Sequence, residues 1–576
     1  MFLWNLKSKF VILSLSCFLL FAEDDFSGED YEDAEHQTTL KSIYFVSSKE
    51  LSAHEEVTDK EAKIISDYLK YRYPENWNKL KKIGVSPETV IFLKNYYTLE
   101  KNKKYNFNFL CRTSYKSENK KTKSSLPLLQ KYSVSSKSIS AGLVLEKDKS
   151  EKEIYEFTSY YGELKKDKFK INAGNYIINW GYGLVFAKPL GKPDFSSVKK
   201  MINPTNKISL HKSSFESGYL SGVSAGYNYE NVTVNAFMSH TGKYYRLENG
   251  KITSLSDDGI HAENETPEVK ENIAGVDLFF QSTYADIGIS AATDNFSHSF
   301  NNPYLSKNNN LVSLIGTLKY DNLSCFGELA NSNKISAFHI GTGFMTDSLK
   351  SVLSYRHFPA KYHSFHQNAI RFSQALHTEE KGILWKTETK LFNKIKLEYM
   401  LNTGYTRKKS SEFPFKKSRF NQKITVKSKI FALSVKQKKT GISNSRFSLR
   451  TRTYRLKHHI MPSKSLKITQ NIQFKEEKSE NKYKSGFLVY AQLEMHKKLY
   501  NFYVRLTAWD TKISLYEHEN NLTGVLLNRI HNGSGSALVL LLKQNIRRNL
   551  KSEIYFRDCL DKKDQKEYAF QIIYNF

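Results

Sequence analysis

A Gly-x-Ser-x-Gly pattern is the first place where residue types and spacing could support chemistry. Gly222-Val223-Ser224-Ala225-Gly226 has the spacing of a hydrolase nucleophile elbow, in which a tight turn exposes the serine hydroxyl. Such an elbow joins a strand to a helix, whereas Tyr227 to Tyr229 and Val232 to Phe237 continue as hairpin strands. The pattern therefore predicts a serine within a strand and not a catalytic nucleophile.

Histidines and cysteines offer no better case for catalysis. The 16 histidines form no HExxH motif, and the one adjacent pair, His458-His459, lies in a basic stretch that does not need a metal. Cys111, Cys325 and Cys559 are widely spaced singletons, so neither a disulfide framework nor a zinc motif follows. No P-loop or dinucleotide fingerprint is present. We expect no enzyme activity, no cofactor and no metal site.

Phosphate binding is the remaining chemistry that a short pattern suggests. Ile83-Gly84-Val85 is a tight apolar turn in which glycine lets backbone N–H groups approach a phosphate closely. Lys79, Lys81 and Lys82 precede it and would add positive charge. These six residues are the candidate nucleic-acid-binding set.

Short helices must position that turn, and segment 40–99 carries their start signals. Ser47-Ser48-Lys49-Glu50 and Thr58-Asp59-Lys60-Glu61 both fit the capping box, and Pro74 ends the helix that the second one starts. A third short helix is expected from Trp77 to Lys82, and Ser86-Pro87 is an N-cap followed by proline at the first helical position of a fourth. The pattern predicts four short helices.

This layout resembles the tandem helix-hairpin-helix modules of competence DNA-binding proteins. The resemblance implies contact with phosphate through the hairpin at Gly84. The first hairpin, His54 to Val57, departs from the family pattern because it has two carboxylates and no glycine. A structural or protein-docking role is therefore favoured for the module, with nucleic acid as the less favoured partner.

From residue 105 to the end, short alternating segments and polar turns follow one another. Roughly two dozen candidate strands fit a large bacterial barrel. The last segment has the period-2 pattern of a barrel-closing strand and ends on a phenylalanine carboxylate. Its apolar face consists of Tyr568, Phe570, Ile572, Tyr574 and Phe576. An ordinary half-buried strand is the alternative for this segment.

The N-terminus has the pattern of an exported protein. Lys7 and Lys9 precede an apolar run from Phe10 to Leu20, which is too short to span a bilayer comfortably, and Ala22 supplies the small residue before cleavage. We expect residues 1–22 to be a signal peptide. Residues 23–39 read as an acidic disordered leader, because eight acidic residues lie between Glu23 and Glu35 without a lysine or arginine. The rest of the chain contains no run of 18 or more apolar residues, which excludes a multi-span helical protein.

Composition agrees with a barrel and leaves the role of charge open. Aromatic residues make up 14% of the chain, as interfacial girdles of a barrel require. The formal net charge is +29, but the basic residues are spread along the chain and fall on the polar faces of strands such as Ile395 to Tyr399. If those faces line a lumen, the interior would favour anionic solutes.

One glycine-rich segment carries a second resemblance. Gly174-Asn175-Tyr176 is followed by Trp180-Gly181-Tyr182-Gly183-Leu184, close to a Gly-Asp/Asn-Tyr and Phe/Trp-Gly-Gln-Gly-Leu signature. This resembles exported proteins, best represented in Bacteroidetes-like bacteria, that join a helix-hairpin-helix module to an outer-membrane barrel. Tyr182 replaces the usual glutamine. Close packing of backbone and rings inside a barrel is the plainer explanation of these glycines.

The combined prediction is a large antiparallel transmembrane β-barrel of roughly two dozen strands at 105–576, with a small all-α helix-hairpin-helix module at 40–99. We expect an outer-membrane protein with its module in the periplasm, acting in solute passage or in docking a periplasmic protein. Its expected partners are outer-membrane lipid and the barrel-assembly machinery. The alternatives are an exported DNA-binding or DNA-uptake protein, and a structural anchor without transport.

Overall fold

The fold was obtained as a computed structural model. It describes residues 41–43, 46, 48–52, 54, 57–71, 74, 76–99, 105–117, 126–148, 155, 157–189, 193, 196–254, 269–373, 378–391, 395–408, 416–442, 448–463, 465–480, 482–497, 499–525, 527–547, 549–561 and 565–575. The signal peptide, the acidic leader, the Ser47 cap and Phe576 lie outside these ranges.

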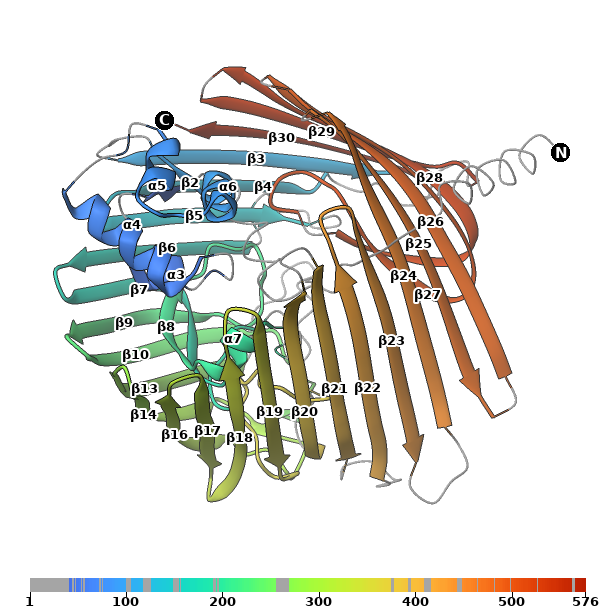
Figure 1. Cartoon of the computed structure of the whole chain (residues 1–576). Helices are drawn as coiled ribbons and strands as arrows, with labels where there is room; N and C mark the ends of the chain where they lie inside the picture. Colours follow the sequence, from blue (N-terminus) through green and yellow to red (C-terminus); the bar gives the residue numbers. More distant parts are fainter. Residues whose placement is uncertain are drawn as a thin grey trace.

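Strands dominate the structure and close on themselves (Figure 1). The closed sheet contains 25 strands, of which β8 pairs with β7 alone, so 24 strands form the wall. The wall strands are β3 (Asn106–Lys116), β4 (Leu128–Ser135), β5 (Ile139–Lys147), β6 (Phe157–Lys166), β7 (Phe169–Gly181), β9 (Leu220–Tyr229), β10 (Val232–Lys243), β13 (Val269–Gln281), β14 (Ala285–Phe296), β16 (Asn308–Tyr320), β17 (Leu323–Ser332), β18 (Ile335–Met345), β19 (Leu349–Phe358), β20 (Thr378–Leu391), β21 (Ile395–Lys408), β22 (Lys416–Lys427), β23 (Phe431–Ile442), β24 (Ser448–Ser463), β25 (Leu466–Ser479), β26 (Lys482–His496), β27 (Tyr500–Glu519), β28 (Leu527–Arg547), β29 (Leu550–Cys559) and β30 (Lys566–Asn575). The predicted large antiparallel barrel of about two dozen strands is confirmed.

The final strand closes the wall. β30, the last wall strand in the chain, pairs antiparallel with β29, which precedes it, and with β3, the first wall strand. Tyr568 and Phe570 lie on its exposed face, while Gln571 and Ile573 on the opposite face are buried. Closure leaves no unpaired edge at this seam, so the backbone groups of the two terminal strands satisfy each other.

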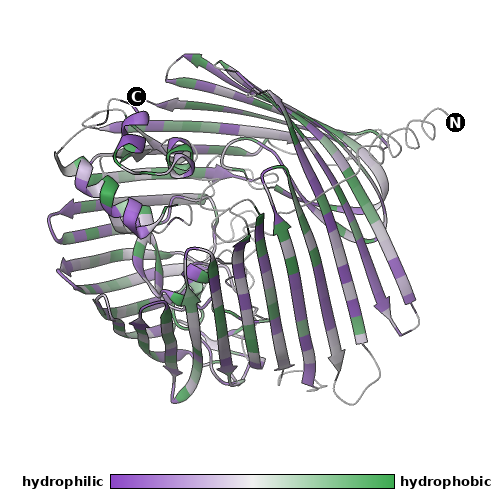
Figure 2. Cartoon of the chain, in the orientation of Figure 1, coloured by the Kyte–Doolittle hydropathy of each residue, from purple (hydrophilic) through white to green (hydrophobic). Residues whose placement is uncertain are grey.

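The two faces of the wall differ in chemistry. Large apolar side chains are exposed on the outer face, and Figure 2 shows hydrophobic and hydrophilic residues alternating along the strands. Examples from β13 to β19 are Val276, Leu278, Ile287, Ile289, Val312, Leu314, Leu329, Ile340 and Leu353. An exterior of this kind suits contact with lipid hydrocarbon. No helix among the described residues is long and apolar enough to cross a membrane.

The two ends of the barrel also differ. At the end where β3 begins, successive wall strands are separated by only two or three residues, and positive φ angles at Asp167, Glu230 and Asp321 fit tight hairpin turns. At the opposite end most connections are longer, including 244–268, 297–307 and 359–377. Parts of the first two connections pair as a small sheet of β11 (Arg246–Glu248), β12 (Lys251–Ser254) and β15 (Ser299–Phe300). We call the two ends the short-turn end and the long-loop end.

Among the described residues, four helices precede the wall, as the start signals predict. They are α3 (Ser48–Ser52), α4 (Asp59–Tyr71), α5 (Asn78–Lys82) and α6 (Pro87–Tyr96). The backbone N–H of Glu61 donates to the Thr58 hydroxyl and Glu61 accepts from the Thr58 N–H, which completes the expected capping box. The Ser86 hydroxyl accepts from Thr89 N–H, the predicted N-cap of α6. A two-residue parallel pairing of β1 (Lys41–Ser42) with β2 (Tyr97–Thr98) ties the ends of this helical module together.

Candidate functional site

The glycine-rich segment leaves the wall and enters the barrel. β7 pairs with β6 up to Gly174 and with β9 up to Tyr176, and from Tyr176 to Gly181 it pairs with β8 (Thr205–Leu210) inside the ring (Figure 1). Gly174 has φ +90°, and a Cβ there would overlap the carbonyl oxygen of Tyr160. Only glycine fits this bend without displacing backbone. We call residues 175–189 and 196–210, which include β8 and α7 (Val198–Ile202), the inner layer.

The residues of the second resemblance come together at the root of the inner layer. The Asn175 side chain donates to the Ser159 hydroxyl (2.9 Å), and the Tyr176 hydroxyl donates to the carbonyl of Met238 (2.8 Å). Tyr176 is fully buried, and Trp180 is 1% exposed. The glycines at 181 and 183 have φ +64° and +85° and carry the chain through a turn before Leu184. These residues position the inner layer and form no catalytic arrangement.

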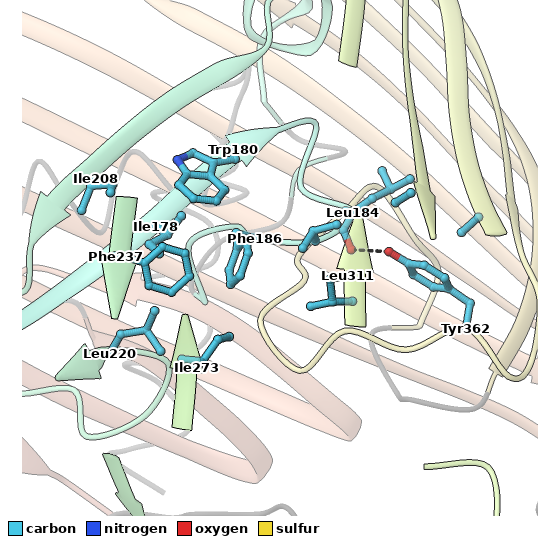
Figure 3. Close-up of a cluster of buried hydrophobic side chains, with 14 of the residues drawn as sticks. Ile178, Trp180, Leu184, Phe186, Ile208, Leu220, Phe237, Ile273, Leu311 and Tyr362 are labelled. Atoms are coloured by element: carbon cyan, nitrogen blue, oxygen red, sulfur yellow. Dashed lines mark hydrogen bonds between the residues drawn. The ribbon is translucent and has the colours of Figure 1, made fainter. Parts of the chain in front are cut away.

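An apolar cluster joins the inner layer to the wall (Figure 3). Trp180 packs edge-to-face against Phe186 and Phe237, with ring centroids 5.2 and 5.5 Å apart. Ile273 and Leu311 of the wall belong to the same buried cluster. Because these contacts come from β10, β13 and β16 as well as β7, the cluster holds the inner layer against several strands of the wall.

A buried carboxylate fixes the turn of the inner layer to the wall. Glu328 of β17, 2% exposed, accepts the backbone N–H of Tyr182 (2.7 Å) and of Leu184 (3.3 Å). Its other oxygen accepts the Ser313 hydroxyl (2.7 Å). A buried carboxylate with three donors is well satisfied, whereas the same group without them would be strongly destabilising.

Tyr182, where the resembled family has glutamine, links three elements. Its hydroxyl lies 2.7 Å from both the carbonyl of Ile202 in α7 and the Thr317 hydroxyl in β16. Burial raises the pKa of the Tyr182 phenol, which keeps it protonated and able to donate. The tyrosine side chain therefore reaches from the turn of the inner layer to α7.

A second segment, from the long-loop end, docks onto the inner layer. We call residues 359–373 the docked loop. Its Tyr362 hydroxyl donates to the carbonyl of Leu184 (2.9 Å), and its Ser364 hydroxyl donates to the carbonyl of Val185 (2.6 Å). Backbone bonds from Ala187 N–H to His366 O and from Asn368 N–H to Gly183 O add to the pairing. The inner layer thus bonds to the wall on one side and to the docked loop on the other.

The base of the docked loop is held by an ion pair. Arg356 and Glu380, at most 1% exposed, pair at 2.8 Å, and Glu380 also accepts the backbone N–H of Phe372 (2.9 Å). The guanidinium of Arg371 lies 4.3 Å from the centre of the Phe358 ring. These contacts give the loop a defined path into the barrel.

The inner layer also touches the helical module. The ammonium of Lys199 in α7 donates to the carbonyl of Ser52 (2.7 Å) and pairs with Asp59 (3.1 Å). α7 packs against β18, β19 and β20 toward the short-turn end, so this contact places α3 and the start of α4 at the same end of the barrel. A displacement of the module can therefore act on α7 directly.

The inward face of the wall differs around its circumference. From β13 to β20 its side chains are mostly buried, whereas Lys436, Arg455, Lys457 and Lys475 are partly exposed. They belong to a basic set on the faces of β22 to β25 opposite the exposed Ile424 and Phe474. The set is Lys417, Arg419, Lys423, Lys427, Lys436, Lys438, Arg455, Lys457 and Lys475. This side of the interior is basic and accessible to water.

The candidate nucleic-acid-binding residues form an exposed turn, but its backbone donors are used within the module. Gly84 has φ +98° and, like Lys81 and Lys82, is exposed. The N–H groups of Ile83 and Val85 donate to Leu80 O, and that of Gly84 donates to Lys81 O. Lys79 is partly buried. Nucleic-acid binding stays a prediction that rests on the lysine side chains.

The serine of the Gly-x-Ser-x-Gly pattern and the adjacent histidine pair both lie within wall strands. Ser224 lies within the antiparallel strand β9, where it accepts from the Asn172 amide (2.9 Å) and is 3% exposed. His458 and His459 are adjacent in β24 and so point to opposite faces of the wall. The sequence did not single out Glu328 or the docked loop, because the register that brings them to the inner layer is not a local property.

Comparison with known proteins gives similarity of fold only. No protein-family model and no curated protein matches the chain. Among solved structures, the siderophore receptor PirA from Pseudomonas aeruginosa aligns over 83% of this chain and 81% of its own, with a TM-score of 0.43 and 8% identity. PirA from Acinetobacter baumannii gives 0.42 and 9% over the same shares. A chain of the E. coli P pilus tip assembly intermediate gives 0.41 and 8%, over 82% and 60%. Similarity at this level identifies neither a family nor a ligand.

Proposed function

We propose that the protein is an outer-membrane β-barrel that passes a solute under control of its inner layer, with the helical module in the periplasm. The observation that carries this proposal is the continuous contact from Asp59 through Lys199 and α7 to Glu328 in the wall, by way of Tyr182. The inner layer lies inside the barrel, so it must move for a solute to pass. The helical module contacts this layer through α7.

The wall and its two ends support this location. An apolar exterior on a closed sheet requires lipid around it, and bacterial barrels of this type have short periplasmic turns and longer outer loops. The helical module lies at the short-turn end, which supports a periplasmic position for it. Outer-membrane lipid and the barrel-assembly machinery are the partners that this location implies.

The basic face of β22 to β25 supports an anionic solute. Lysine and arginine side chains on one side of a water-accessible interior lower the free energy of an anion there. In planar bilayers, the reversal potential under a salt gradient is expected to indicate preference for the anion. Preference for the cation would contradict this part of the proposal.

The barrel and its control can be tested in sequence. Protein from isolated outer membranes is expected to migrate faster in SDS without boiling than after boiling, because a closed barrel stays compact until heated. Deletion of residues 40–99 is then expected to change single-channel conductance or capture of a periplasmic protein. Unchanged conductance and unchanged capture would remove the module from the mechanism.

Two alternative functions, a structural anchor and DNA binding, are each favoured by one observation. The buried inward faces of β13 to β20 favour a structural anchor that conducts nothing, and absence of conductance for both the full chain and the deletion variant would select it. The exposed Lys81 and Lys82 favour DNA binding. Salt-dependent DNA binding that is lost when both lysines are changed to glutamate would select that alternative.

A further inference from the structure

Three side chains converge where the docked loop meets the wall near the long-loop end. Glu271 of β13, Asp294 of β14 and His366 of the docked loop place one ligand atom each within 4.8 Å of one another. His366 Nε2 lies 2.9 Å from Glu271 Oε1, and the Lys243 ammonium lies 3.4 Å from Glu271 Oε2. No other group of three His, Cys, Asp or Glu side chains is so arranged among the described residues.

The hydrogen bonding of this cluster is incomplete. Asp294 is 0% exposed, and neither of its carboxylate oxygens has a hydrogen-bond partner among the described residues. Glu271 is 1% exposed, and within the part of the chain that the structure describes its Oε2 contacts only the Lys243 ammonium, as an ion pair at 3.4 Å and not as a hydrogen bond. Three carboxylate oxygens beside an imidazole are thus buried without donors. A buried carboxylate without a donor needs a cation, a proton or water.

We propose that Glu271, Asp294 and His366 bind a divalent transition-metal ion that joins the docked loop to the barrel wall. Two carboxylates and one imidazole are ligands that Mn²⁺ or Zn²⁺ accepts, and an all-oxygen site for Ca²⁺ would lack the imidazole. The ion takes the place of the hydrogen bond between His366 and Glu271, with the imidazole neutral. This site is independent of the solute proposed above.

Charge supports a cation and also explains why the site can be held together without one. With both carboxyl groups ionised and the imidazole neutral, the two carboxylates and the Lys243 ammonium carry a net charge of −1, which an added cation compensates. The Lys243 ammonium neutralises part of the negative charge of Glu271, so it competes with the metal ion for that carboxylate. Removal of Lys243 should therefore strengthen metal binding, which a purely structural ion-pair cluster would not do.

The location gives the ion a structural consequence. β13 and β14 are adjacent wall strands, and His366 lies in the loop whose neighbours bond to Val185 and Leu184 of the inner layer. The backbone of His366 itself accepts from Ala187 N–H. An ion at this point fixes the docked loop, and through it the inner layer, to the long-loop end of the wall.

The test uses full-length protein in detergent, freed of metal with a chelator. Mn²⁺ is the probe, because its free-ion electron paramagnetic resonance signal falls on binding, with Zn²⁺ as competitor. The expected result is one bound Mn²⁺ per chain, which Zn²⁺ displaces and Ca²⁺ at the same concentration does not. Asp294→Asn and His366→Gln should each weaken binding on the order of tenfold or more, and Lys243→Met should tighten it by a similar factor.

Asp286→Asn is the matched control. Asp286 is also an inward, buried aspartate of β14, but it pairs with Lys319 at 2.7 Å and lies outside the cluster. It should leave Mn²⁺ binding unchanged. The heat-dependent mobility shift confirms closure of each variant barrel, and His366→Gln, in a loop, remains informative if Asp294→Asn does not assemble. No Mn²⁺ bound by the wild-type protein, or equal binding by wild-type, Asp294→Asn and His366→Gln proteins, would overturn the proposal.

A second measurement tests the structural consequence. Mn²⁺ should slow amide hydrogen exchange in a peptide covering 359–373 of the wild-type protein, and should leave the same peptide unchanged in His366→Gln. Equal slowing in both proteins would show that the ion acts elsewhere and would reject the site.

Discussion

The carboxylate of Glu328 accepts the backbone N–H of Tyr182 at 2.7 Å, although the two residues are 146 positions apart in the chain. One comes from the barrel wall and the other from the turn of the inner layer. The bond is short and buried, and when the carboxyl group is ionised it belongs to the stronger, charge-assisted class of protein hydrogen bonds. Its loss should free the inner layer without opening the wall.

Glu328→Gln tests this relationship. The amide keeps the shape of the side chain, but its oxygen is a neutral and weaker acceptor for the N–H groups of Tyr182 and Leu184, and its –NH2 group must donate to the Ser313 hydroxyl. We expect a loss of about 1–3 kcal/mol in the stability of the inner layer and a higher conductance in planar bilayers. Glu248→Gln, on the exposed hairpin β11, is the control and should not change conductance. Equal conductance of wild-type and Glu328→Gln barrels would mean that this bond does not restrain the inner layer.

Gly174 and Gly316 offer a matched pair of glycine substitutions. Gly174→Ala places a methyl group against the Tyr160 carbonyl and forces an alanine to adopt φ +90°, which alone costs about 1–3 kcal/mol. Gly316, in β16, has no atom within 4 Å of the position that an added methyl group would take, so alanine fits there. We expect a reduced yield of the fast-migrating form in unboiled SDS samples for Gly174→Ala alone. Equal yields would show that the bend at Gly174 tolerates a side chain.

The sequence predicts the elements of this fold better than their arrangement in the interior. Alternation at Tyr568 and Phe570 predicts an exterior strand, and the Thr58 to Glu61 capping box predicts the start of α4, because both are encoded within a few residues. The signature from Gly174 to Leu184 predicts close packing. Its path into the barrel does not follow from it, because that path depends on β8 and on a register shared with distant strands.

The candidate metal residues show the same limit more sharply. Glu271 and Asp294 look like ordinary polar positions of an alternating strand, and only the pairing of β13 with β14 places them side by side. His366 joins them from a loop about 70 residues further along, which no spacing rule connects to either strand. Motif searches for paired histidines or cysteines cannot detect this kind of site, and the expectation of no metal rests on such motifs.

Leu314→Arg tests whether the exterior faces lipid. Leu314 is 53% exposed near the middle of β16, where an arginine at the bilayer midplane costs about 2–4 kcal/mol. We expect lower recovery of the folded barrel from outer membranes. The control is Tyr320→Arg at the end of the same strand, which is 76% exposed and should have a smaller effect because the interface hydrates the charge. Equal effects at the two positions would argue against a hydrocarbon layer around β16.

The stability of the helical module should depend on pH through Glu61. Burial of this carboxyl raises its pKa, but hydrogen bonds from Ser86 and Thr58 outweigh burial and leave the pKa below the ordinary 4.5. Because the folded-state pKa is lower than the unfolded one, the contribution is complete above the unfolded pKa and is lost as pH falls through the folded value. Hydrogen exchange in 57–93, corrected for intrinsic rates, should accelerate on acidification below about pH 4.5. Glu61→Gln should remove that acceleration, and the same acceleration in the variant would assign it to another group.

Lys199→Met tests the contact between the module and the inner layer. The methionine keeps the aliphatic stem but loses the bonds to Ser52 and Asp59. Since the Asp59 side chain is 78% exposed, the ion pair is screened by water, and we expect the whole change to weaken docking by no more than about 1 kcal/mol. Hydrogen exchange in α3 should then rise by up to about fivefold. Lys94→Met, on the exposed face of α6, is the control that removes a module charge without touching α7. If conductance changes with Lys199→Met and not with Lys94→Met, the module acts on the inner layer through α7; if exchange rises while conductance stays constant, the contact holds the module in place without controlling passage.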